Sequence, residues 1–113
     1  MEKKNLLFNL ADNITKKTFK LTLDFPQKFQ YSLGDQLRRS CLSIVLNIVE
    51  GGARLSQKEK KQFLNIAFGS LKETKYLLYF SNDLRLIKKE DFEKLVDEIN
   101  HLAKLIYGLL YKK

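Results

Sequence analysis

Asn47, Glu50 and Arg54 are the side chains whose types and spacing could do chemistry. An amide, a carboxylate and a guanidinium three and four residues apart could orient a substrate or move a proton, provided that a nucleophile, a base or a metal stood beside them. They lie in the apolar stretch SIVLNIVEGGARLS, residues 43–56. This stretch is therefore either an active site or the end of a helix that holds a partner.

The residue types that would complete a catalytic site are scarce. His101 is the one histidine and Cys41 the one cysteine in 113 residues, and Cys41 has no sequence-local partner that would lower its pKa. The pair Gly51-Gly52 lacks the lysine-serine ending of a phosphate-binding loop. The carboxylates between residues 90 and 98 lack the Glu-x-x-His spacing of helix-borne metal sites. We therefore expect no enzymatic activity, no metal and no other cofactor.

The composition indicates one helical domain over residues 1–113. A hydrophobic content of 44% is that of a folded protein, and one proline with five glycines favours long helices over short strands. Neither a signal peptide nor an apolar run of ~18 residues is apparent. With Cys41 expected as a buried free thiol, a cytoplasmic location follows.

Apolar residues recur at spacings of three and four in four segments, which predicts helices at approximately 5–23, 33–51, 57–83 and 90–111. We expect a capping box to begin the second helix at Ser32 and the third at Ser56. The glycines 51 and 52 are expected to end the second helix in a left-handed cap. The predicted fold class is all-α, an antiparallel up-down four-helix bundle.

Two of these helices are unusual. The second has one polar stripe within about 80° of arc and is otherwise apolar, which predicts a subunit interface and a homo-oligomer; the stripe is Gln36, Arg39, Ser43, Asn47, Glu50 and Arg54. The third has a core face that includes Ile66 and the small residues Ala67, Ser70 and Thr74. Its opposite face carries lysines in line with tyrosines, which suit a nucleic-acid backbone and stacked bases, or else an ordinary solvated face.

The net charge of +8 favours a polyanionic partner. A lysine-rich surface that only promotes solubility would give the same charge. The candidate phosphate-binding residues are Arg38, Arg39, Arg54, Lys58, Lys60, Lys61 and Lys72. The residues expected to serve assembly or structure are Asn47, Glu50, Gly51, Ser70 and Glu73.

The stretches FQYSLGDQLRRSCLSIVLNIVEGGAR and SQKEKKQFLNIAFGSLKE resemble the four-helix-bundle proteins encoded in intervening sequences of bacterial large-subunit ribosomal RNA genes. The same superfamily includes the accessory variability proteins of diversity-generating retroelements. Val49 stands where alanine is common in the family, and Cys41 where a small residue is usual.

This resemblance implies a homopentamer shaped as a barrel, without known catalytic activity, for which RNA or DNA binding is the proposed role. The family's recurrent polar positions correspond to Arg38, Arg39, Asn47, Glu50 and Glu73, and whether they serve assembly or ligand binding stays open. The alternative function is a protein-interaction scaffold, or an accessory subunit for a reverse transcriptase of a retroelement.

Overall fold

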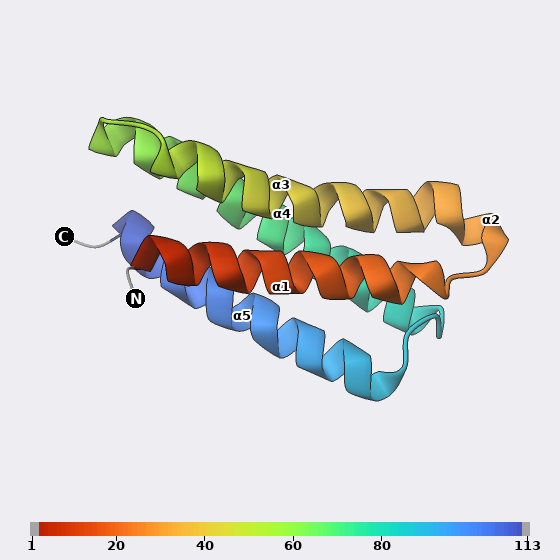
Figure 1. Cartoon of the computed structure of the whole chain (residues 1–113). Coiled ribbons are helices and arrows are strands. Elements are labelled where there is room, and N and C mark those ends of the chain that lie inside the picture. The colour runs from red at the N-terminus through yellow and green to blue at the C-terminus, as the bar shows by residue number, and fades with distance from the viewer. Residues whose placement is uncertain (1–2, 112–113) are drawn as a thin grey trace.

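The computed structural model describes residues 3–111, with side chains from residue 6 onward, and every regular element in that range is a helix. The chain folds into four long helices. Figure 1 shows that they pack lengthwise and that each runs back along the one before it. They are α1 (Lys3–Leu23), α3 (Asp35–Gly52), α4 (Gln57–Asp83) and α5 (Lys89–Tyr111), with the short α2 (Gln27–Phe29) and the π-helical turn η1 (Gln30–Gly34) at the corner between α1 and α3. The expected all-helical fold with four long helices is confirmed.

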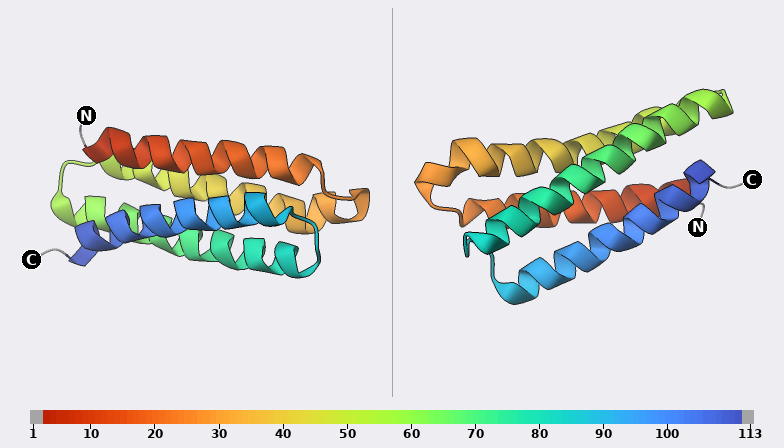
Figure 2. Two further views of the ribbon diagram at one scale, coloured as in Figure 1. Left: turned by 90° about the horizontal axis from the view of Figure 1, so that it is seen from below. Right: turned by 180° about the vertical axis from the view of Figure 1, so that it is seen from behind.

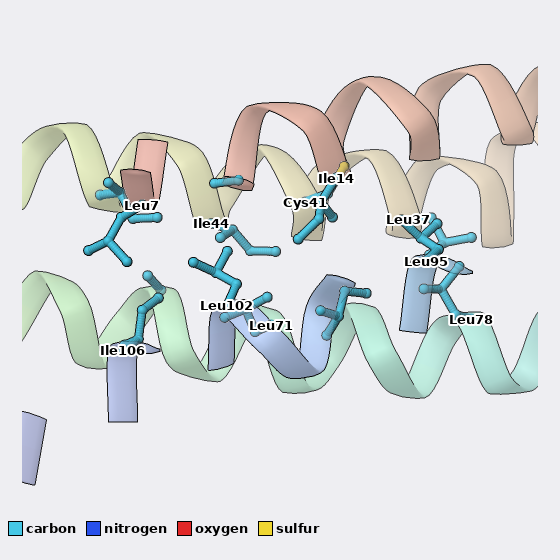
Figure 3. Packing of buried hydrophobic residues seen from close by; sticks show 14 of the residues in the cluster. Leu7, Ile14, Leu37, Cys41, Ile44, Leu71, Leu78, Leu95, Leu102 and Ile106 are labelled. Carbon is cyan, nitrogen blue, oxygen red and sulfur yellow. The ribbon is translucent and has the colours of Figure 1, made fainter. Parts of the chain in front are cut away.

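The four long helices enclose one core. Helix α1 packs against α3 and α5, and α4 packs against the same two helices, so each long helix has two neighbours (Figure 2). Figure 3 shows the apolar side chains that each helix directs to the middle, among them Ile14, Ile44, Leu71 and Leu102. Burial of these side chains is the main favourable term in folding. Ile66 is an exception to the prediction, because it is exposed on α4.

The start of the second long helix differs from the prediction. The Ser32 hydroxyl reaches only the carbonyl oxygen of Phe29, at 3.5 Å, and caps nothing. The extended backbone of Pro26 (φ −53°, ψ 148°) already leads the chain into a helix at Gln27. By residue 32 the backbone N–H groups have helical partners, so no capping box is needed there.

The end of α3 also differs from the prediction. No glycine in the described range has a positive φ, and the helix continues through Gly52 to a right-handed Ala53 (φ −85°, ψ −10°). Gly51 serves close packing instead, since a Cβ there would lie 3.1 Å from the Cβ of Phe63 and 3.4 Å from the Lys60 carbonyl oxygen. The expected left-handed cap is therefore wrong, and the glycine lets α3 and α4 approach each other.

The predicted start of the third long helix at Ser56 is confirmed, with Ser56 as its N-cap. The backbone N–H of Glu59 donates to the Ser56 hydroxyl oxygen at 3.1 Å, and that hydroxyl lies 3.2 Å from the Glu59 carboxylate. This cap satisfies one of the free N–H groups at the start of α4. It fixes the first turn of the helix that carries all four candidate lysines.

Candidate nucleic-acid interface

The outward face of α4 carries a continuous polar strip, which we call the α4 row. All of its members are exposed: Lys58, Lys61, Gln62, Asn65, Gly69, Lys72, Tyr76 and Tyr79. The opposite side of α4 supplies the core, with Leu71 and Leu78 fully buried. Among the described residues, no carboxylate pairs with the three lysines of the row. The row therefore presents uncompensated positive charge to solvent.

Two tyrosines of α5 extend this surface, and the sequence reasoning missed them. The Tyr107 ring lies 6.1 Å from the ring of Phe68 on α4 and 4.6 Å from the ring of Tyr111. The Lys72 ammonium lies 5.1 Å from the centre of the Phe68 ring. The only sequence signal was two tyrosines four residues apart on the flank of the apolar face of α5.

Arg38 ties the corner between α1 and α3 together. Its guanidinium donates to the Thr22 hydroxyl oxygen at 2.9 Å, to the Gln30 carbonyl oxygen at 2.7 Å and to the Asp35 carboxylate at 2.9 Å. The side chain is 20% exposed, and Gly34 leaves room for it, because a Cβ there would lie 3.1 Å from a guanidinium nitrogen. These bonds occupy the guanidinium, which makes Arg38 a weaker candidate for phosphate contact than the lysines of α4.

The other basic candidates lie in different settings. Arg54 pairs with Glu50 at 2.8 Å, four residues earlier, and its guanidinium lies 4.9 Å from the centre of the Phe63 ring. This pair forms because the helical path continues past the glycines. Arg39 is exposed on α3, whereas Lys60 is half-buried at the edge of an open pocket of about 450 Å³.

A polar seam joins α3 to α4. The hydroxyls of Ser43 and Ser70 lie 2.7 Å apart, and the Thr74 hydroxyl donates to the Ser40 hydroxyl oxygen at 2.8 Å. The Asn47 amide donates to the Ser43 carbonyl oxygen at 2.7 Å and to its hydroxyl oxygen at 3.2 Å. Ser70 therefore helps to hold the two helices together, whereas both hydrogen bonds of Asn47 lie within α3 and end on Ser43, the partner of Ser70.

Helix α3 also carries an exposed apolar ridge. The large side chains of Leu42, Leu46 and Val49 lie on its outer side, and Leu46 is 57% exposed. The inner side of the same helix is buried against α1 and α4. This distribution agrees with the sequence pattern, in which apolar residues cover more of the helix than one core requires.

The side chains considered for catalysis are not brought together. Cys41 is fully buried, with its sulfur 3.3 Å from the Arg38 carbonyl oxygen, and burial raises the pKa of the Cys41 thiol to about 11. The thiol is therefore protonated at neutral pH. His101 and Glu73 are exposed on different helices. In the described part of the chain, no three side chains of His, Cys, Asp or Glu converge as metal ligands.

The comparison with known protein families decides what the chain is related to. Residues 3–108 match the family of 23S rRNA-intervening sequence proteins. The chain belongs to this family. A similar solved structure, described as a protein with unknown function from the S23 ribosomal protein family of Bacteroides thetaiotaomicron, has a TM-score of 0.84 at 23% identity and covers 96% of this chain and 98% of that one. This likeness shows a shared fold. No curated protein matches.

This intervening sequence protein thus has two outward surfaces of different character. The α4 row with its neighbouring tyrosines is basic and aromatic, and the α3 ridge is apolar. None of the described helices is both long enough and apolar enough to cross a membrane. The surfaces differ in the partners that they suit, since polyanions pair with the first and apolar protein surfaces with the second.

Proposed function

We propose that this 23S rRNA-intervening sequence protein is a non-enzymatic homo-oligomer that binds RNA or DNA through phosphate contacts made by the α4 row. The observation that carries this proposal is the alignment of Lys58, Lys61 and Lys72 on one exposed face, without a carboxylate partner in the described range. At 1.5 Å per residue they span roughly 21 Å along α4. The net charge of +8 supports the same proposal.

Lysine contacts to phosphates bring a specific physical consequence. Each contact releases counterions from the nucleic acid, so affinity falls steeply as salt rises. Phosphate contacts carry no sequence information directly. We therefore expect weak sequence preference and strong salt dependence.

Replacing Lys58, Lys61 and Lys72 together by Gln is expected to weaken binding to a nucleic acid by about a hundredfold at 0.1 M salt, because three phosphate contacts are lost. Fluorescence anisotropy with a labelled RNA measures this. The matched control replaces the exposed lysines 20, 28 and 94, which lie outside the α4 row, and removes the same total charge. A smaller loss, below about tenfold, is expected for it.

Equal losses in both triple variants would show that only net charge matters and that the α4 row is not a site. No affinity of the unchanged protein for RNA or DNA at low salt would end the proposal. The scaffold alternative would then be tested with an acidic protein partner.

The second part of the proposal concerns assembly through the α3 ridge. Leu42, Leu46 and Val49 form an apolar strip beside the exposed Arg39 and Glu50, a composition suited to an interface between copies of the chain. An apolar centre supplies affinity, and flanking charges fix register. The family resemblance leads us to expect a pentamer. The ridge faces away from the core and lies on a different helix from the α4 row.

A further inference from the structure

The α5 tyrosines next to the α4 row remain exposed, although their rings contact Phe68 and each other. Tyr107 is 54% exposed and Tyr111 is 62% exposed, and neither hydroxyl forms a hydrogen bond with another described residue. The Tyr79 ring is less exposed, at 44%, and meets Phe92 edge-on at 5.1 Å and 88°. The rings of Tyr107 and Tyr111 are tilted by 44°.

These rings belong to one surface with the lysines. Contacts run without a break from the Lys72 ammonium to the Phe68 ring, on to Tyr107 and then to Tyr111. Tyr76, 64% exposed, lies one helical turn beyond Lys72. From residue 99 to residue 111 the sequence contains no acidic residue. We call Phe68, Tyr76, Tyr107 and Tyr111 the aromatic strip.

From this juxtaposition we infer that the nucleic acid bound at the α4 row is single-stranded, and that its bases stack on the aromatic strip while Lys72 contacts its backbone. The inference rests on the proposed function and adds that the bound nucleic acid is unpaired. In a duplex the faces of the bases are stacked on one another inside the double helix. The tyrosine side chains on the surface of α4 and α5 cannot reach them there. In a single strand the bases can turn outward and stack on tyrosine rings, with little dependence on sequence.

The experiment compares a labelled uridine strand of roughly 12 nucleotides, a length within the range of single-strand sites, with a duplex of the same length. We expect tighter binding of the single strand at the same salt. Tyr107→Leu and Tyr111→Leu should each weaken it by about tenfold, because each removes one stacking platform. Tyr107→Phe should retain affinity, since the ring remains.

Two controls separate stacking from other effects. Tyr31 is 80% exposed on η1, which follows α2 directly, and Figure 1 shows α2 at the opposite end of the bundle from the C-terminal end of α5. Tyr31→Leu should therefore leave affinity unchanged. In the two leucine variants of Tyr107 and Tyr111, affinity should fall by the same factor at every salt concentration, because no phosphate contact is removed. Circular dichroism of each variant establishes that the bundle is folded.

Preference for the single strand, with losses confined to Tyr107→Leu and Tyr111→Leu, supports the inference. Equal or tighter duplex binding, or full affinity in both leucine variants, overturns it while leaving the proposed function intact. Absence of binding to either probe by the unchanged protein overturns both.

Discussion

Arg38→Met is expected to lower the free energy of unfolding by about 2–4 kcal/mol, whereas Arg39→Met, the same change at the next residue, should cost less than about 0.5 kcal/mol. Arg38 is mostly buried and bonded to Thr22, Gln30 and Asp35. Its removal leaves a hydroxyl and a carbonyl oxygen at the corner without their donor. Arg39 is exposed, and its side chain forms no hydrogen bond or ion pair with another described residue.

Urea unfolding followed by circular dichroism measures both variants under identical conditions. Arg38→Lys should recover little of the lost stability, because one ammonium cannot reach acceptors on three sides as a planar guanidinium does. Equal stability of the two methionine variants would contradict the structural role of Arg38. It would also restore Arg38 as a free candidate for phosphate contact.

Leu46→Glu is expected to raise the dissociation constant of the proposed oligomer by at least about a hundredfold, because a carboxylate without a partner would be buried between copies. Light scattering coupled to size exclusion should then give the mass of a single chain at micromolar concentration. The free energy of unfolding of that chain should change little, because Leu46 is exposed in the monomer.

The matched control is Leu23→Glu at the end of α1, which makes the same change at a side chain that is 75% exposed and outside the α3 ridge. It should leave the oligomer intact. A monomeric unchanged protein at micromolar concentration, or an intact oligomer with Glu at residue 46, would contradict assembly through the ridge.

The fold was largely predictable because the apolar periodicity of each helix is strong. The range 57–83 expected for the third helix equals that of α4, whose start is fixed by the N-cap residue Ser56. Helix ends set by long-range packing were not predictable. Gly51 resembles a cap in sequence, and only the approach of Phe63 shows that it is needed for contact between helices. Likewise, Ser32 matches a capping pattern, but the helix has already begun at Gln27.

The candidate site was predictable where a single helix defines it. The lysines and tyrosines of α4 share a face through their spacing alone, and the structure exposes that face. The contribution of α5 requires knowledge of how two helices pack, because the Tyr107 ring of α5 contacts the Phe68 ring of α4. Arg38 could not be separated from Arg39 in sequence, since the difference arises from the corner that α2 and η1 form.

The most direct test of phosphate binding by the α4 row is the dependence of RNA affinity on salt. For the unchanged protein, the logarithm of the association constant should fall linearly with the logarithm of salt concentration. In the triple glutamine variant of Lys58, Lys61 and Lys72, the slope should be smaller in magnitude by about 2, because three contacts at roughly 0.7 each are lost for a single strand. A slope that is the same in both proteins would contradict phosphate contact by these lysines.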